Sequence, residues 1–396
     1  MRFIAVPIVV FTSIAGCATD RSNRQDQLPH GTVYANTVDD LLSQIKNKQA
    51  KAEAIVSLGL NYCQEIDEQK LSCLMNLMQL RDVSLAQTTI TDKTIEFLGE
   101  LRNLRRLDLQ HTHITNRSLA IIKELIRIEE LNLWFTKVGD AGVEDLAAIA
   151  CLSILNLNET QVSDTGLKSL AHLKKLKILE LSRTDVSDDG VTYLRGLPDL
   201  EVLNLSHTRV GDNALESVGG FKKLRVLWLN NVNVTDSGLA RMKELKRLRK
   251  LYLAGTGVTD RGLGFLAELK ELAVLDLDRT AVGDKVFESL KQNRGLEQLS
   301  LKATKVTDDG LKYLNMGKLR ALCLSETRIT DKSARYLQNL EECRTLQLKG
   351  TKITDRALKH LGSLRKLEAL DLRSTNTTAE GIEKLGRSRP DIVIAR

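Results

Sequence analysis

The sequence is poor in the residues that organise many globular and extracellular proteins. Its 396 residues include only 7 Phe, 6 Tyr, 2 Trp, 4 Pro and 6 Cys. Six cysteines are too few for a disulfide scaffold in a chain of this length. The basic excess is small, with 58 Lys and Arg against 51 Asp and Glu and a net charge of +7. This is far from the clustered excess of a nucleic-acid-binding protein, so we expect no nucleic-acid partner.

Arrangements of catalytic and metal-binding residues are also missing. The sequence has no glycine-rich phosphate loop, and its six histidines show no metal-ligand spacing. Asp276 and Asp278 are two residues apart, about 6.6 Å along a strand, a separation that would admit a carboxylate pair. Arg279 and Lys302 lie close to them, which favours an ordinary charge cluster instead. We therefore expect a protein that is not an enzyme, with no cofactor and no metal.

Leucine is abundant by contrast, with 69 residues or about 17% of the chain. A motif T-x-[I/V]-x-D recurs, preceded each time by L-x-x-L-x-L and followed by a helical pattern. Its first position falls at Thr88, Thr112, Thr136, Thr160, Thr184, Thr208, Val232, Thr256, Thr280, Thr304, Thr327, Thr351 and Thr375. Every spacing is 24 except one of 23, between Thr304 and Thr327. Such a fixed period indicates one supersecondary unit repeated many times.

This repeat resembles that of the leucine-rich repeat proteins. It is similar to the 24-residue bacterial repeats and to the cysteine-containing repeats of F-box substrate receptors, with Thr where those families usually have Asn or Cys. The resemblance covers residues from about 50 to 396. It implies an α/β solenoid (a horseshoe), with a parallel β-sheet on the concave face and short helices on the convex face. It says little about function, because the architecture hosts many unrelated tasks.

Elementary packing predicts the same fold. The two leucines of L-x-L share one face of a strand, so stacked units bury them together. We expect the Thr to bond backbone groups where the chain leaves the strand, as a ladder from unit to unit. We expect the Asp to be the N-cap of the outer helix. A single unit encloses no core, so the ends need caps. We place an N-terminal cap and degenerate first repeat at 38–80, repeats at 81–379 and a C-terminal cap at 380–396, whose residues 390–394 form a closing edge strand.

The N-terminus has the features of a secretory signal at residues 1–16. Met1 and Arg2 precede an apolar run of twelve residues, which is too short to cross a bilayer comfortably. The following Ile-Ala-Gly-Cys17 resembles the lipobox of bacterial lipoproteins, which implies that Cys17 becomes a mature N-terminus bearing acyl chains such as palmitate. Ala18 then favours the outer over the inner membrane of the bacterial cell envelope. The alternative is an ordinary signal peptide with a chance cysteine.

Residues 17–37 are polar and without apolar periodicity, and we interpret them as a flexible stalk. Leu58 and Leu60 in the N-terminal cap occupy the strand positions of a degenerate repeat. Cys63 and Cys73 lie in the same cap. In an oxidising compartment they would form a disulfide, and the equal alternative is that both are small buried residues.

Function in such a scaffold is expected where the repeat does not dictate the residue. The residue between the paired leucines, and the one two positions later, should point from the concave sheet. The residues we select as a partner-binding surface are Trp134, Phe135, Trp228, Tyr252, Asn204, Asn230, Asp276 and Asp278. Large aromatic residues on a solvent-facing sheet are favoured anchors for partners. The alternative is that each aromatic ring packs flat on its neighbours and binds nothing.

A second candidate surface is basic. Lys222, Lys223, Lys246 and Arg247 come just before successive strands, on one rim of the predicted solenoid. Such a rim attracts anionic head groups or acidic polymers, or it is a solvated edge that prevents aggregation.

The sequence therefore predicts a non-enzymatic, lipid-anchored leucine-rich repeat protein, monomeric, that recognises a protein or peptide through its concave sheet. An F-box-like receptor of a ubiquitin ligase is one alternative, although no F-box segment precedes the cap. A translocated effector acting on host proteins is another, and a purely structural role in the envelope is the last.

Overall fold

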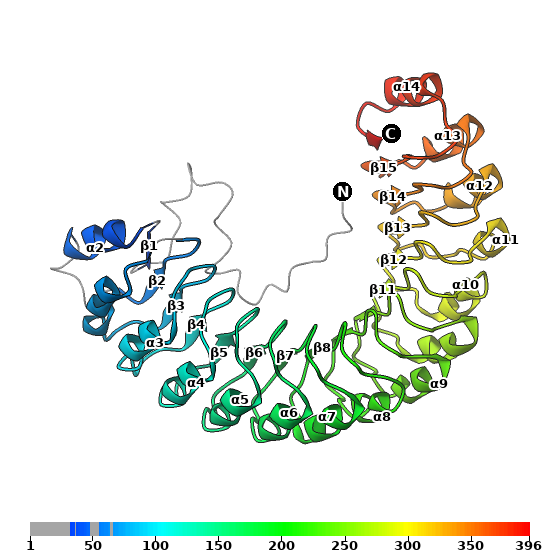
Figure 1. The fold of residues 1–396 in the computed structure, drawn as a ribbon. Helices are drawn as coiled ribbons and strands as arrows, with labels where there is room; N and C mark the ends of the chain where they lie inside the picture. The colour runs from blue at the N-terminus through cyan, green and yellow to red at the C-terminus, as the bar shows by residue number, and fades with distance from the viewer. Residues whose placement is uncertain (1–31, 36, 48–54, 64–65) are drawn as a thin grey trace. The chain divides into compact units, whose positions relative to one another are not determined.

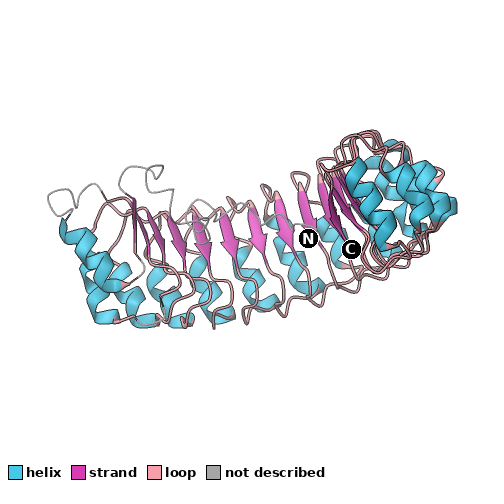
Figure 2. Ribbon diagram, turned by 90° about the horizontal axis from the view of Figure 1, so that it is seen from above, coloured by secondary structure: helices cyan, strands magenta, loops and turns pink. Residues whose placement is uncertain are grey.

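The computed structural model describes residues 32–35, 37–47, 55–63 and 66–396. The chain forms two compact units, Met1–Leu200 and Glu201–Arg396. In each unit three-residue parallel strands follow one another in chain order along the inner, concave side, and helices cover the outer side (Figure 1, Figure 2). The predicted signal peptide and Cys17 lie outside the described residues.

The first unit alternates strands and helices from residue 32 onwards. Its strands are β1 (Thr32–Tyr34), β2 (Ser57–Gly59), β3 (Asp82–Ser84), β4 (Arg106–Asp108), β5 (Glu130–Asn132), β6 (Ile154–Asn156) and β7 (Ile178–Glu180). Its helices are α2 (Val38–Asn47), η3 (Glu68–Asn76), α3 (Asp92–Leu98), α4 (Asn116–Ile122), α5 (Asp140–Leu146), α6 (Asp164–Leu170), α7 (Asp188–Tyr193) and η4 (Leu194–Gly196).

The second unit has the same alternation, with outer helices of more varied length. Its strands are β8 (Val202–Asn204), β9 (Val226–Trp228), β10 (Lys250–Tyr252), β11 (Val274–Asp276), β12 (Gln298–Ser300), β13 (Ala321–Cys323), β14 (Thr345–Gln347), β15 (Ala369–Asp371) and β16 (Val393–Ala395). Its helices are α8 (Ala214–Val218), α9 (Asp236–Leu239), η5 (Ala240–Met242), η6 (Asp260–Glu268), α10 (Val286–Ser289), η7 (Leu290–Gln292), α11 (Asp308–Leu311), η8 (Asp331–Ser333), α12 (Ala334–Leu337), α13 (Asp355–Leu361) and α14 (Ala379–Ser388).

The repeat leucines form the core of each unit. Leu107 and Leu109 in the first unit, and Leu251 and Leu253 in the second, are fully buried. Register aligns equivalent residues of successive repeats, as in Leu251 opposite Leu275. Each fully buried leucine contributes about 1.5–3 kcal/mol before the entropy of ordering is subtracted.

The predicted stalk is wrong at its C-terminal end. Residues Thr32–Tyr34 form β1, which pairs in parallel with β2, and Val33 is buried. A three-residue strand needs only one buried side chain to dock on an existing sheet edge, so it leaves no periodicity for sequence reading to detect. At the other end, β16 pairs with β15 where we expected the closing edge strand.

The repeat Thr does not form a ladder from unit to unit. The Oγ1 of Thr112 donates to the carbonyl of Leu109 at 2.6 Å, and Thr256 does the same to Leu253 at 2.7 Å. These bonds stay within one repeat, where they close the turn that follows the strand. The residue just before the Thr sits in the left-handed region in most repeats, for example Phe135 with φ of 54°.

The repeat Asp forms the ladder instead, and the prediction that it is the N-cap is wrong by one position. Thr91 is the N-cap of α3, and Asp92 is the first helical residue. The Asp92 carboxylate accepts from the backbone N–H of Thr115 at 2.8 Å and from its hydroxyl at 2.7 Å. Burial works against this charge, but the hydrogen bonds from Ser118 and Thr115 outweigh it and lower the pKa of Asp92.

This ladder explains the glycine two residues after the Asp in many repeats. A Cβ on Gly166 would lie 2.7 Å from Oδ1 of Asp140, and one on Gly190 would lie 2.2 Å from Oδ1 of Asp164. Where the glycine is replaced by Ser118, the hydroxyl donates to the carboxylate of the preceding repeat at 2.6 Å. In these repeats the position holds either no side chain or a donor to the carboxylate, whereas Ala214, Val286 and Ala357 occupy it in three others.

Candidate functional site

The predicted aromatic residues of the second unit form a stacked pair on the inner face of the sheet. Trp228 ends β9 and Tyr252 ends β10, and the two residues are register partners. Their ring centroids are 5.2 Å apart and the ring planes are within 3° of parallel. Both side chains are half-buried. Asn204 and Asp276 are the register neighbours on either side of the pair.

The position that these rings occupy has a structural task in other repeats. An Asn or Asp there accepts a hydrogen bond from the backbone N–H two residues later, which the short strand leaves without a ladder partner. Asn132 accepts from Trp134 at 3.2 Å, Asn204 from Ser206 at 3.0 Å and Asp276 from Asp278 at 2.9 Å. An unpaired buried backbone N–H is costly, so this position is constrained by the fold.

The aromatic residues remove that acceptor, and the preceding repeat replaces it. The hydroxyl of Ser206 accepts from the N–H of Asn230, two residues after Trp228, at 3.2 Å. The amide oxygen of Asn230 accepts from the N–H of Ala254, two residues after Tyr252, at 2.9 Å. The scaffold therefore accommodates both rings without losing a backbone hydrogen bond.

Ser300 also stands where other repeats have Asn or Asp, and Asp278 of the preceding repeat takes over the acceptor role. Its Oδ1 accepts from the N–H of Lys302 at 2.8 Å and also from the hydroxyl of Ser300. Asn204, Asn230, Asp276 and Asp278 were selected as partner-binding residues, and in this structure their side chains bond the scaffold. The sequence pattern did not reveal this role, and it did not single out Ser206.

Burial shapes the electrostatics of this face. Burial, together with the charge of Asp276, raises the pKa of Tyr252 to about 12. Burial and then the neighbouring charge of Asp278 raise the pKa of Asp276 to about 7. Asp108, at the equivalent position of the first unit, has its pKa raised by burial to about 6. Near neutral pH these carboxyl groups carry less charge than ordinary surface aspartates.

The aromatic residues of the first unit cluster around a histidine. His111 lies 4.8 Å from Trp134, edge to face, and 4.7 Å from Phe135, with the rings stacked. Phe135 sits in the turn after β5 with 53% of its surface exposed. The indole N–H of Trp134 is buried and meets no acceptor among the described residues, so this cluster holds a donor that the scaffold leaves unused.

The basic rim of the second unit is exposed and partly neutralised. Lys222, Lys223, Lys246 and Arg247 are all exposed. Lys246 forms an ion pair with Glu268 at 2.8 Å, and the Nζ of Lys222 donates to the carbonyl of Gly219 at 3.2 Å. The rim is therefore a mixed-charge edge in which Lys246 has a carboxylate partner.

The two cysteines of the N-terminal cap are not bridged. Cys63 is buried and Cys73 is half-buried, and burial raises the pKa of the Cys73 thiol. The alternative of two small buried residues therefore describes the cap better than a disulfide. Within the described ranges, no group of three His, Cys, Asp or Glu residues is placed to hold a metal ion. None of the helices in those ranges is both long and apolar enough to cross a membrane.

Comparison with known protein families identifies the repeats. A family model described as a leucine-rich repeat region matches residues 191–388, and a second, also a leucine-rich repeat, matches 100–120, 149–171 and 172–194. No curated protein gives a significant sequence match.

Several solved structures share the fold. A leucine-rich repeat protein of Leptospira interrogans is 18% identical with a TM-score of 0.62, covering 91% of this chain and 93% of that one. An internalin of Listeria monocytogenes is 22% identical with a TM-score of 0.59, covering 83% and 94%. A TDR receptor is 14% identical with a TM-score of 0.55, covering 92% and 70%. Identities this low show the fold alone.

Proposed function

Because this chain belongs to the leucine-rich repeat proteins, we propose that it is a non-enzymatic recognition protein that binds a protein or peptide partner on the inner face of its sheet. The observation that carries the proposal is the stacked pair of Trp228 and Tyr252. Several repeats have Asn or Asp at this position, whereas these two consecutive repeats carry aromatic rings, and Ser206 and Asn230 supply the missing acceptors. One of the similar structures is a receptor, which agrees with a recognition role.

The stacked pair suits recognition for physical reasons. Trp and Tyr present large rigid surfaces with polar edges, and they are over-represented among residues that dominate binding energy. Because each ring is fixed against the other, little side-chain entropy remains to be lost when a partner docks. A partner with an apolar or aromatic side chain would cover the rings. Its polar groups would meet the Asn and Asp residues that lie beside the rings on the inner face.

We further propose that the protein is held at a membrane by acylation of Cys17. The support is the sequence: an apolar run of twelve residues followed by Ile-Ala-Gly-Cys17. Several acyl chains give stable anchoring without a membrane-spanning helix. The expected location is the bacterial cell envelope, with the outer membrane favoured by Ala18, and the protein is expected to act as a monomer.

The binding proposal is tested with purified full-length protein and variants as baits against solubilised envelope proteins, quantified by mass spectrometry. Trp228→Ala and Tyr252→Ala should each reduce recovery of the specific partner about tenfold, the effect of losing a residue worth more than about 1.4 kcal/mol. Tyr193→Ala is the matched control, because Tyr193 is 41% exposed on the outer helix α7. Equal recovery by all four proteins would refute the proposal.

The anchor is tested separately by mass spectrometry of the N-terminal peptide. Wild-type protein should yield a peptide that starts at Cys17 and carries acyl chains, and blocking lipoprotein signal processing should restore the uncleaved N-terminus. Cys17→Ser should release the protein from the membrane fraction. An unmodified Cys17 within an intact N-terminus would contradict the anchor without bearing on the binding face.

A further inference from the structure

One repeat of the second unit departs from the others, and a cavity lies beside it. The spacing from Thr304 to Thr327 is 23 residues, and the four-residue outer helix α11 is not extended by a 3-10 turn, as α9 and α10 are by η5 and η7. The position that carries a buried leucine in other repeats, such as Leu269, carries Asn293 and then Met316 in two consecutive repeats. A shorter helix and smaller or more flexible core residues leave space between neighbouring repeats that the regular repeat fills.

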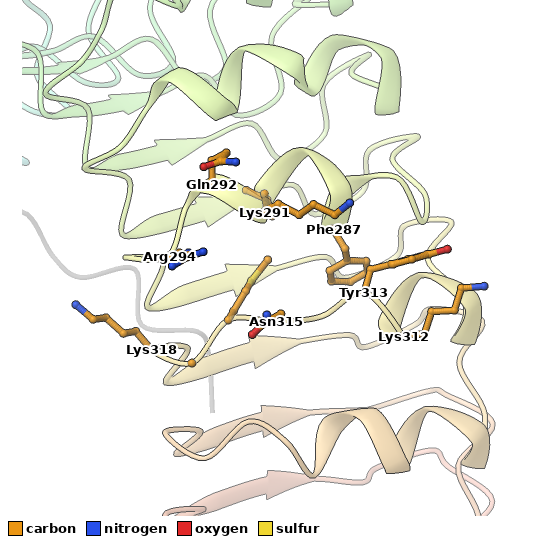
Figure 3. Close-up of a pocket in the computed structure, with 11 residues that line it drawn as sticks. Phe287, Lys291, Gln292, Arg294, Lys312, Tyr313, Asn315 and Lys318 are labelled. Carbon is orange, nitrogen blue, oxygen red and sulfur yellow. The ribbon is translucent and has the colours of Figure 1, made fainter.

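The resulting cavity has a volume of about 760 Å³ and lies on the outer side of the unit (Figure 3). This is within the size range of small-molecule sites. Its lining includes four basic residues, Lys291, Arg294, Lys312 and Lys318, and the rings of Phe287 and Tyr313. No acidic residue lines it.

The basic residues fall into two groups, one of which lies beside Tyr313. Its ring, 53% exposed, has the Nζ of Lys312 at 5.2 Å and that of Lys291 at 5.9 Å from its centroid. Figure 3 shows Arg294 and Lys318 on the other side of the cavity, away from the Tyr313 hydroxyl. The cavity therefore has an aromatic ring with two cations on one side and two further cations on the other.

These cations are poorly neutralised by the protein. Lys291 approaches Glu288 only to 3.7 Å and Lys312 approaches Asp309 only to 3.6 Å, within their own helical turns and at exposed positions. No carboxylate of the described residues lies within ion-pair distance of Arg294 or Lys318.

Nearby basic residues of the same unit behave differently. Arg320 pairs with Glu297 at 3.2 Å, and Arg344 pairs with Glu368 of the following repeat. Among the described residues the cavity thus gathers four cations, two with only distant carboxylates and two with none within ion-pair distance. Four positive charges around one concave surface repel one another and favour a multiply charged anion.

We propose that this cavity binds a phosphorylated sugar or cyclitol carrying at least two negative charges. Arg294 and Lys318 would hold one phosphoryl group and Lys291 and Lys312 a second, because guanidinium and ammonium groups donate charge-assisted hydrogen bonds to phosphoryl oxygens. The apolar face of the sugar ring would lie against Tyr313. The same chemistry occurs in a free sugar phosphate and in a lipid headgroup.

The test uses the full chain with two probes that share a headgroup: soluble inositol bisphosphate, measured by calorimetry, and vesicles of phosphatidylcholine containing phosphatidylinositol phosphate, measured by co-sedimentation. Wild type should bind inositol bisphosphate saturably, with an affinity that falls as salt rises. Additional binding to the vesicles would assign the ligand to a lipid headgroup, and binding of the soluble probe alone would assign it to a free sugar phosphate.

Variants decide whether the cavity is responsible. Arg294→Gln with Lys318→Gln should weaken binding about tenfold or more, the loss expected for charge-assisted hydrogen bonds. Lys222→Gln with Lys223→Gln removes the same charge from the rim of the same unit and should leave the affinity within about twofold.

A second variant blocks the cavity without changing its charge. A Cβ on Gly317, a lining residue, would meet no atom within 4 Å, so Gly317→Phe is tolerated locally and adds bulk at the wall. It should also weaken binding at least tenfold. Absence of saturable binding by wild type, or equal weakening by the cavity and rim variants, would overturn the proposal.

Discussion

Removal of the Asp140 carboxylate is the sharpest test of how successive repeats are joined. Asp140 is the first residue of α5, and its Oδ1 accepts from the N–H of Ser163 at 2.7 Å and from that of Gly166 at 3.1 Å. Its Oδ2 accepts from the Ser163 hydroxyl at 2.5 Å. Asp140→Ala therefore removes three hydrogen bonds to the next repeat and leaves two backbone N–H groups without this acceptor.

The expected loss follows from the charge of the acceptor. A hydrogen bond to a charged group contributes about 1.5–3 kcal/mol, and bonds that share one carboxylate are not additive. We expect Asp140→Ala to lower the free energy of unfolding by about 2–4 kcal/mol. Loss of an acidic residue from the first helical turn adds a few tenths of a kcal/mol to this destabilisation, because the negative charge no longer interacts with the helix dipole.

Gly166→Ala supplies the second half of a double-mutant cycle. The added Cβ would lie 2.7 Å from Oδ1 of Asp140, and the next contact is Val162 at 3.1 Å. In the wild-type background this overlap should cost about 1–3 kcal/mol. In the Asp140→Ala background the closest atom is gone, and replacing a helical glycine by alanine is favourable by about 1 kcal/mol. The coupling energy should therefore be at least about 1 kcal/mol in favour of the double variant.

The assay is urea unfolding of the four proteins, followed by circular dichroism and by tryptophan fluorescence. Amide exchange at Ser163 reports the local bond directly and should accelerate in both Asp140→Ala variants. If the two single losses sum to the loss of the double variant within about 0.5 kcal/mol, the carboxylate is not the reason for the glycine, and our explanation of the repeat is wrong.

Further predictions concern the inner face and the cap. Asp276→Asn should stabilise the protein increasingly as pH rises from about 4 to about 7, since burial and then the charge of Asp278 raise the folded pKa of Asp276 above its ordinary value and wild type loses stability over this range; equal pH profiles by thermal unfolding would contradict this. Asn230→Ala should cost about 1–2 kcal/mol in urea unfolding because the N–H of Ala254 loses its acceptor, and a neutral effect would refute the compensation. Reductant should leave the melting temperature of the wild type unchanged, because Cys63 and Cys73 are not bridged. A decrease that is abolished in the variant with Cys63→Ser and Cys73→Ser would contradict this.

Much of the fold could be predicted because leucine spacing alone determines which face of each strand is buried. The roles of the polar residues were harder. Thr91 and Asp92 are adjacent, both suit a helix start, and only the position of the next repeat shows that Asp92 reaches across while Thr91 caps. Sequence spacing describes one repeat at a time, and these bonds join two.

The candidate site was predicted only in part, again because sequence spacing does not show bonds between repeats. The faces of Trp228 and Tyr252 follow from strand alternation. The scaffolding roles of Asn230 and Asp278 depend on bonds between repeats, so spacing could not separate them from binding residues. The one-residue change in spacing places a missing residue near 315–318, but the volume of the cavity beside Tyr313 depends on how neighbouring repeats pack, which spacing does not describe.

The most direct test of the recognition proposal is photo-crosslinking in cells of the source organism. A benzoyl-phenylalanine side chain at position 252, in place of Tyr252, keeps an aromatic ring on the inner face, and the same group in place of Tyr193 reports the outer face. We predict one discrete protein adduct from position 252 that is lost when Trp228→Ala is introduced in the same chain, and none from position 193. An adduct that survives Trp228→Ala, or that forms equally from both positions, would contradict recognition through the inner face.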